Sequence, residues 1–210
     1  MADDTFSART RVMRRPQRAR YDRESVHAIL DAAQICHVGI VRDGLPVVLP
    51  TIHARDGDTL LLHGSTAAGF VRDVRKGTAL CITVTIVDGL VLSRAVRNHS
   101  MNYRSAVIFG DGVLVRDGVE KLRALEVITD RLVPGRWSTT RPPSEQELRE
   151  TAVVAVPITE ASAKIRTGLP GDTDADAGIT AWAGVIPIVT TFGEPERAPF
   201  CPDGAVAPSW

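Results

Sequence analysis

The chain has 210 residues, and its 25 lysines and arginines balance its 25 aspartates and glutamates, so its formal net charge is zero. A chain with this balance has no overall field that would draw it to nucleic acid or to an anionic membrane, and we expect neither as a partner. It contains no run of about 18 apolar residues, which speaks against a membrane-spanning helix, and its length allows one domain with a substantial core.

The first 21 residues are predicted to form a basic, flexible arm before the folded domain. Residues 9–20 contain six arginines, and no apolar stretch of the secretory kind follows them. Because Asp3 and Asp4 precede the arginines, a mobile or partner-clasping arm is favoured over a transit segment or a nucleic-acid arm. We therefore expect a soluble, cytoplasmic protein.

The folded domain is predicted to begin with an amphipathic helix and a β-meander. The helix covers residues 24–34, where Val26, Ile29 and Leu30 recur at helical spacing behind a capping Ser25. The strands that follow are expected at 35–41, 46–54 and 59–63. Asp-Gly pairs between apolar runs are a strong hairpin signal, and residues 43–118 contain five, at residues 43, 56, 88, 111 and 117. Such turns predict an antiparallel sheet or barrel.

The second half of the chain continues with strands and short helices. Its predicted elements, in chain order, are a helix at 66–76, strands at 80–87 and 106–110, helices at 119–132 and 144–151, and strands at 152–158 and 182–191. Ser144 and Glu147 form a capping box at one helix start, and Pro187 places the last strand at a sheet edge or a bulge. A Pro-rich tail at 193–210 is expected to lie extended on a surface. The elements predict a mainly β fold with α (α+β).

The connection between the strands at 80–87 and 106–110 is a candidate site, because it gathers polar and cationic side chains. Its members are Ser93, Arg94, Arg97, Asn98, His99, Ser100, Asn102, Tyr103, Arg104 and Ser105. Arginine presents a rigid, planar set of N–H donors, and the side chains of serine and asparagine can both donate and accept hydrogen bonds. Such groups suit a ligand that is anionic or forms many hydrogen bonds. A solvated loop of ordinary turn-forming residues explains the same composition equally well.

A second candidate lies where a predicted strand gives way to a helix, at His63-Gly64-Ser65-Thr66. Backbone N–H groups at such a start could hold a phosphate, although a plain helix cap is the reading that the residues alone favour. His53 and His63 fall on neighbouring strands and could face one cavity, but lone histidines on strands are more often structural. Three widely spaced cysteines and an acidic segment at 169–178 that lacks the EF-hand pattern indicate neither a disulfide framework nor a metal site.

These elements in this order resemble the pyridoxamine 5′-phosphate oxidase-like flavin-nucleotide-binding family, especially its branch with the nitroimidazole resistance proteins. The resemblance covers residues 22–192, and its most specific part is VTIVDGLVLSRAVRNHSMNYRSAVIFGDG at 84–112. It implies an antiparallel split β-barrel of the FMN-binding type with short flanking helices. It also implies a homodimer with FMN at the subunit interface, where the protein would oxidise or reduce a small organic substrate.

The resemblance also implies roles for particular residues. The cofactor-binding set is Val48, Leu49, Pro50 and Thr51 at the isoalloxazine edge, His63, Gly64, Ser65 and Thr66 beside the ribityl phosphate, and Arg72, Arg94, Asn102 and Arg104 as further polar groups. His63 and Tyr103 are the candidate proton donors. Family members that hold FMN firmly place a cation soon after the His-Gly-Ser turn, whereas the first one here is Arg72. The missing cation makes a cofactor-free binding module one alternative. Relatives within the wider fold imply two others, a haem bound by His63 or His53, or a deazaflavin.

Overall fold

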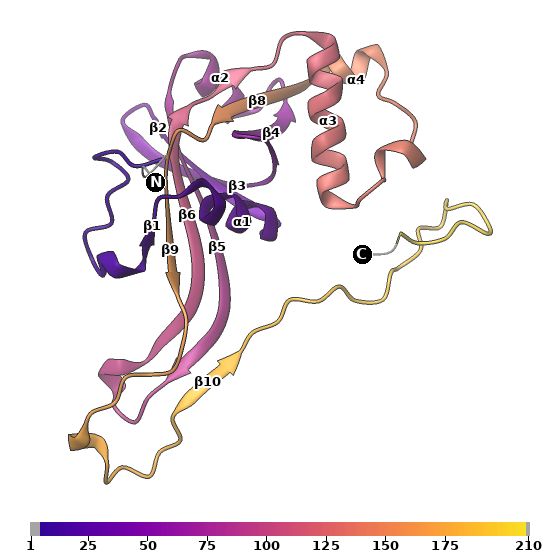
Figure 1. Cartoon of the computed structure of the whole chain (residues 1–210). Coiled ribbons are helices and arrows are strands. Elements are labelled where there is room, and N and C mark those ends of the chain that lie inside the picture. Colours follow the sequence, from indigo (N-terminus) through magenta and orange to yellow (C-terminus); the bar gives the residue numbers. More distant parts are fainter. Residues whose placement is uncertain (1–4, 209–210) are drawn as a thin grey trace.

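The computed structural model describes residues 5–208, and its centre is one antiparallel sheet of ten strands that does not close (Figure 1). The strand order is β1-β9-β6-β5-β2-β3-β4-β8-β7, and β10 pairs with β5 off this path. The strands are β1 (Ala19–Arg20), β2 (Ile35–Arg42), β3 (Leu45–Asp56), β4 (Thr59–Ser65), β5 (Ala79–Leu92), β6 (Ser100–Asp111), β7 (Val113–Leu114), β8 (Thr151–Pro157), β9 (Glu160–Arg166) and β10 (Gly184–Pro187). The predicted mainly β fold of the split-barrel type is confirmed.

Four short α-helices flank the sheet, namely α1 (Arg23–Ala32), α2 (Gly69–Arg75), α3 (Gly118–Leu132) and α4 (Glu145–Glu150). Asp22 caps α1 by accepting a hydrogen bond from the backbone N–H of Ser25 at 2.8 Å, so the cap lies three residues before the predicted Ser25. The capping box of Ser144 and Glu147 at α4 is present as predicted. No helix within residues 5–208 is long and apolar enough to cross a membrane.

The main core lies between α1 and the inner face of the barrel. Val26, Ile29 and Leu30 of α1 are fully buried against alternate residues of β5, such as Ile82 and Val84. Full burial of each such side chain contributes about 1.5–3 kcal/mol relative to its exposure. A smaller core lies beneath α3. These two cores fix the barrel from which longer strands project.

The structure differs from the prediction in the second part of residues 93–105, because β6 already begins at Ser100 and only residues 93–99 connect it to β5. β5 and β6 pair from Ala79 to Val91, and only a short stretch with the 3₁₀ turn η2 (Val96–Asn98) connects them. β9 was not predicted at all. Pairing of β6 with both β5 and β9 satisfies its backbone groups, and this overrides the weak strand preference of its polar residues.

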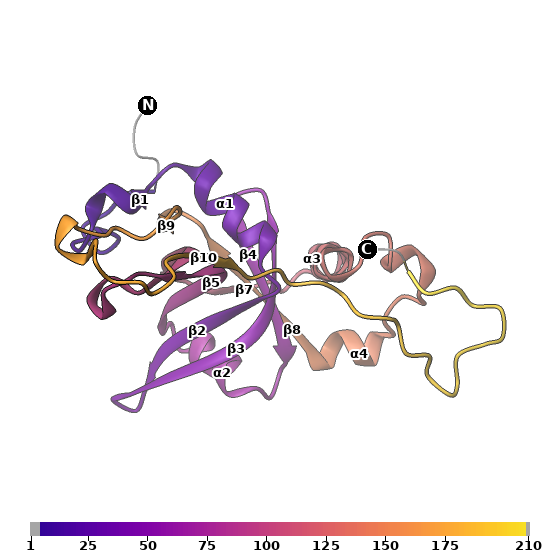
Figure 2. The same ribbon diagram turned by 90° about the horizontal axis from the view of Figure 1, so that it is seen from below.

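The two ends of the chain behave differently. Thr5 is buried, and its hydroxyl donates to the carbonyl oxygens of Tyr21 at 2.6 Å and Ala161 at 2.9 Å, so the described part of the N-terminal arm packs on the domain. Asp3 and Asp4 lie outside the described residues. The tail beyond β10 is extended and exposed, and it runs past the end of α3 (Figures 1 and 2). Pro187 stands in an edge strand, because β10 pairs with β5 alone.

Candidate functional site

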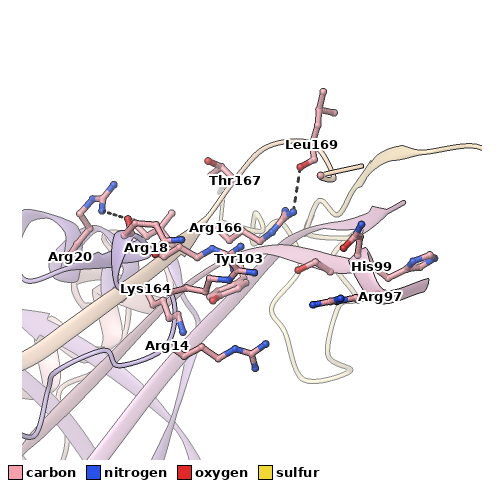
Figure 3. Close-up of a pocket in the computed structure, with 16 residues that line it drawn as sticks. Arg14, Arg18, Arg20, Arg97, His99, Tyr103, Lys164, Arg166, Thr167 and Leu169 are labelled. Atoms are coloured by element: carbon pink, nitrogen blue, oxygen red, sulfur yellow. Dashed lines mark hydrogen bonds between the residues drawn. The ribbon is translucent and has the colours of Figure 1, made fainter. Parts of the chain in front are cut away.

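A cavity of about 780 Å³ lies where the N-terminal segment, the β5–β6 connection and the end of β9 meet (Figure 3). Its cationic lining residues are Arg14, Arg15, Arg18, Arg20, Arg97, Lys164 and Arg166. No aspartate or glutamate of the described chain lines it. We call this site the basic cavity.

The fold joins the walls of the basic cavity through one short strand pairing. The 3₁₀ turn η1 (Pro16–Arg18) leads into β1, and β1 pairs with β9 so that Ala19 lies opposite Lys164. Arg15, just before η1, has φ 58° and ψ 57°, the left-handed conformation that a side chain with Cβ rarely adopts. Backbone strain of this kind costs about 1–3 kcal/mol and tends to occur at functional sites.

Arg166 is the buried cation of the basic cavity, with 9% of its surface exposed. Its guanidinium donates to the side-chain oxygen of Asn102 and to the carbonyl oxygens of Gly168 and Leu169, all of them neutral acceptors. Burial, and after it the positive charge of Arg18, lowers the pKa of Arg166. A buried charge that no opposite charge compensates is costly, so this position favours a bound anion.

Other arginines nearby are neutralised. The predicted cofactor contacts Arg94 and Arg104 are ion-paired, Arg94 with Asp172 at 2.9 Å and Arg104 with Asp88 at 2.7 Å. In contrast, none of the seven cations of the basic cavity forms an ion pair with a carboxylate of residues 5–208. The positive charge available to a ligand therefore lies in the basic cavity rather than at Arg94 or Arg104.

An apolar surface adjoins the basic cavity and shares part of its wall. It is a hollow of about 490 Å³ lined by Leu90, Val91, Leu92 and Met101, together with His99, Ser100 and Tyr103, which also line the basic cavity. We call this hollow the apolar shelf. A cationic cavity beside an apolar shelf suits a ligand that carries both anionic groups and a flat apolar part. The predicted proton donor Tyr103 stands at the boundary between them.

The predicted ring-edge residues Val48–Thr51 lie in the first half of β3, where the barrel splits. This half pairs with β2, but β4 pairs with β3 only from His53 to Asp56. The other edge of Val48–Thr51 is therefore not paired with any strand in the described part of the chain, and the Val48 side chain is 63% exposed. An open strand edge offers backbone groups to a ligand or to a partner chain.

The His63–Thr66 turn lies at the end of β4, and it does not begin a helix as predicted. The next helix, α2, begins at Gly69, and the backbone N–H of Thr66 donates to the carbonyl oxygen of Glu150 at 2.8 Å. Ser65 accepts a hydrogen bond from the backbone of Ala67 at 3.2 Å. A methyl group on Gly64 would lie 3.1 Å from the Phe70 ring, so a larger residue here would require that ring to shift. Arg72 is exposed and donates to the carbonyl oxygen of Ala67 at 3.1 Å.

His53 and His63 face opposite sides of the sheet, so they do not share a cavity. His53 lies directly opposite Leu62, and the next residue along a strand points to the other face. His53 is 1% exposed, and its Nε2–H donates to the carbonyl oxygen of Leu30 at 3.0 Å. The Nδ1 atom of His63 is buried without a hydrogen-bond partner in the described chain, and burial lowers the pKa of His63.

The structure thus brings together only part of the predicted site. Tyr103 lines the basic cavity, and Asn102 lies behind it as the partner of Arg166. Sequence reasoning missed Lys164 and Arg166, and it treated the arginines of residues 14–20 as a separate arm. The cluster of arginines in that arm was the available signal. Within residues 5–208 no group of three or more His, Cys, Asp or Glu side chains is arranged to hold a metal ion.

Comparison with known proteins gives consistent results. The family model described as pyridoxamine 5′-phosphate oxidase matches residues 22–165. The chain is similar to the flavocytochrome Anf3 from Azotobacter vinelandii, at 40% identity and a TM-score of 0.91, with 96% of this chain and 94% of that one covered. It is similar to the FAD and haem binding protein from Mycobacterium smegmatis, at 36% identity and a TM-score of 0.87, with 91% and 94% covered.

A more distant similarity supports the branch predicted from the sequence. A protein assigned to 5-nitroimidazole antibiotic resistance, from Bacteroides thetaiotaomicron, is 27% identical with a TM-score of 0.60, and 69% of this chain and 84% of that one are covered. No match was found among curated proteins.

Proposed function

The chain belongs to the pyridoxamine 5′-phosphate oxidase family, and from this membership we propose that it is a flavoprotein that oxidises or reduces a small organic molecule. The observation that carries the proposal is the similarity, over 96% of the chain, to a solved flavocytochrome. When bound, the flavin supplies the electron or hydride transfer, and the protein supplies binding and orientation.

We propose FAD as the flavin, rather than the FMN inferred from the sequence. The M. smegmatis relative is described as binding FAD, and it is similar over 91% of this chain. The residues present fit a flavin nucleotide, because a basic cavity for phosphates adjoins an apolar shelf for a flat ring. Val48, which the sequence predicted at the ring edge, lies beside Gly39, and Gly39 pairs with Cys81, nine residues before Leu90 of the apolar shelf, so Val48 does not face that shelf in the same copy of the chain.

Candidate proton-handling groups stand near these surfaces. Tyr103 carries a phenol at the boundary of the basic cavity and the apolar shelf, and His99 lines both as well. Tyr103 can hold or release a proton at its hydroxyl, and His99 can do so at a ring nitrogen. The cations beside them stabilise negative charge that develops on a bound substrate.

We further propose that the working unit is a homodimer in the cytoplasm. β10 and the tail expose large apolar side chains, among them Ile186, Val189 and Phe200, which a second copy of the chain would cover. The three free cysteines, Cys36, Cys81 and Cys201, suit a reducing compartment. A solution mass near twice that of the 22.6 kDa chain is the expected result.

The test is the visible absorption spectrum of the protein as purified, followed by incubation with FAD or with FMN and desalting. We expect a retained flavin spectrum with FAD and a weaker one with FMN. The denatured protein should then release FAD, which chromatography identifies. A folded protein that retains neither flavin would remove the proposed function.

We propose haem binding as a second candidate function, alongside flavin binding in the same molecule. Two similar proteins are described as a flavocytochrome and as an FAD and haem binding protein. The observation from this chain is the Nδ1 atom of His63, which is buried and has no hydrogen-bond partner in the described residues. A neutral imidazole nitrogen of this kind is a suitable axial ligand. Haemin titration followed by the Soret band tests it.

A further inference from the structure

The basic cavity concentrates uncompensated positive charge in a molecule that is otherwise neutral. It holds seven of the 25 lysines and arginines of the chain and none of its described aspartates and glutamates. Two like unit charges about 4 Å apart repel by about 1 kcal/mol even in water, and by more near a protein surface. A cluster of this kind is unfavourable in the free protein, and a bound polyanion would offset the repulsion.

The cations come from three segments and surround a hollow, so they do not form a flat stripe. Figure 3 shows Arg14 and Arg18 from the N-terminal segment, Arg97 from the β5–β6 connection, and Lys164 and Arg166 from β9 around the same opening. A long nucleic acid is recognised by an extended basic surface, whereas this arrangement suits a compact anion. The volume of about 780 Å³ exceeds what one phosphate group would fill.

Arginine forks favour phosphate oxygens in particular. Each guanidinium presents planar N–H donors that can bind two oxygens at once, and such charge-assisted pairs are about twice as strong as neutral hydrogen bonds. Arg166 is held in place by neutral acceptors, so its charge remains available. Arg18 and Arg97 form no ion pair with residues 5–208 and stand closer to solvent.

We propose that the basic cavity binds the diphosphate group of a dinucleotide, with Arg166 at its floor and Arg18 and Arg97 at its rim. The proposal rests on the proposed flavin function where the dinucleotide is FAD, but the same chemistry would also hold a reduced nicotinamide dinucleotide that feeds electrons to the flavin. In both cases the adjoining apolar shelf accepts a flat part of the ligand.

The experiment measures binding of inorganic pyrophosphate and ADP to the full-length protein after removal of any bound cofactor, by calorimetry. Inorganic phosphate serves as the reference anion. We expect pyrophosphate to bind at least about tenfold more tightly than phosphate, and its affinity to fall as salt is raised. The double variant Arg18→Gln/Arg97→Gln should bind pyrophosphate about a hundredfold more weakly, at about tenfold for each lost charge-assisted pair.

The control variant Arg123→Gln/Arg149→Gln removes two arginines on α3 and α4, outside the basic cavity. It should bind pyrophosphate as the wild type does. Equal pyrophosphate affinity in the wild type and in Arg18→Gln/Arg97→Gln, or no pyrophosphate binding by the wild type, would overturn the proposal. Both double variants lie at exposed or half-exposed positions, so their folding can be checked by thermal melting.

Competition then identifies the dinucleotide. FAD that displaces ADP from the basic cavity identifies the flavin, NADPH that does so identifies a nicotinamide co-substrate, and failure of both would overturn a dinucleotide site. The two proposals fail separately. Pyrophosphate binding that depends on Arg18 and Arg97 in a protein that takes up no flavin would keep the cavity and reject the flavin function. FAD binding that is equally tight in Arg18→Gln/Arg97→Gln, in a protein that binds no pyrophosphate, would keep the flavin function and reject the basic cavity as a diphosphate site.

Discussion

Asn102 and Arg166 lie on adjacent strands, and the side-chain oxygen of Asn102 accepts a hydrogen bond from the buried guanidinium of Arg166. The contact fixes the direction of the guanidinium and leaves its charge intact, because the amide of Asn102 is neutral. An aspartate at the same position would neutralise the cation. The choice of asparagine therefore preserves a positive charge at the floor of the basic cavity.

The substitution Asn102→Asp tests this arrangement. We expect pyrophosphate affinity to fall at least about tenfold, because the new carboxylate pairs with Arg166 and takes the place of the ligand. The melting temperature should be equal to that of the wild type or higher, since a buried charge gains a partner. Calorimetric titration and thermal melting measure the two effects.

Asn102→Ala is the companion variant, because it removes the contact without adding a charge. It should lower the melting temperature, since loss of a hydrogen bond to a charged group costs about 1.5–3 kcal/mol. A well-folded Asn102→Asp protein with wild-type pyrophosphate affinity would show that Arg166 does not contact the anion.

Much of the sheet could be predicted because its signals are local. The Asp-Gly turns at 43 and 56 join β2, β3 and β4, and the apolar alternation of β5 marks its buried face. β9 was not predicted because it contains few residues with a high strand preference; its sequence is Glu-Ala-Ser-Ala-Lys-Ile-Arg. Its place comes from pairing with β1 and β6, which are far away in the sequence.

The site was harder to predict for the same reason. The sequence drew attention to the arginines of residues 9–20 and to the polar connection at 93–105, but nothing local indicated that they meet. The pairing of Ala19 and Arg20 with β9, together with the contacts of Arg9 with Glu160 and of Thr5 with Ala161, brings the first group beside Lys164 and Arg166. Arg94 and Arg104 were conspicuous in the sequence, and their aspartate partners became visible only in the structure.

His53 should make the stability of the fold depend on pH. Burial is the main cause that lowers the pKa of His53 below its usual 6.5, and the pKa of His63 is lowered by burial too. As the pH drops below 6.5, the unfolded chain binds more protons than the folded one. The free energy of unfolding should therefore decrease with falling pH, over the range between 6.5 and the lower pKa values of the folded state. Urea unfolding at several pH values measures this.

The variant His53→Gln keeps a donor for the carbonyl of Leu30 and removes the titrating group. Its free energy of unfolding should change less between neutral and mildly acidic pH than that of the wild type. An identical pH dependence in both proteins would show that His53 does not contribute.

Gly89 should control the attachment of β10 to the sheet. It stands at a register shift in β5, and a methyl group there would lie 2.9 Å from the carbonyl oxygen of Ile186 and 3.1 Å from the Val185 side chain. We expect Gly89→Val to release β10, so that amide exchange at residues 184–187 rises and proteases cleave there more readily. Gly178→Ala is the control, because a methyl group at Gly178 would meet nothing within 4 Å.

The two main cores lie away from this contact, so the melting temperature of Gly89→Val should stay close to that of the wild type. If β10 and the tail clasp a second copy of the chain, the same variant should also shift the solution mass toward the monomer. A dimer of Gly89→Val with unchanged protection at 184–187 would mean that the strand accommodates the larger side chain.

His63 is the residue that we expect to bind the haem iron, through its Nδ1 atom. Because burial lowers the pKa of His63, its ring is neutral at physiological pH and the buried Nδ1 atom can carry a lone pair for iron. We expect the wild type to retain haemin through desalting with a clear Soret band, and His63→Ala to retain at least about tenfold less. The Nδ1 atom of His53 also has no hydrogen-bond partner in the described residues, but His53 faces the opposite side of the sheet and is only 1% exposed, so His53→Gln should behave as the wild type. A Soret band that is lost in His53→Gln and kept in His63→Ala would make His53 the haem ligand instead of His63. A wild-type protein without a Soret band would reject haem binding, and the flavin function would still be decided by the flavin spectrum.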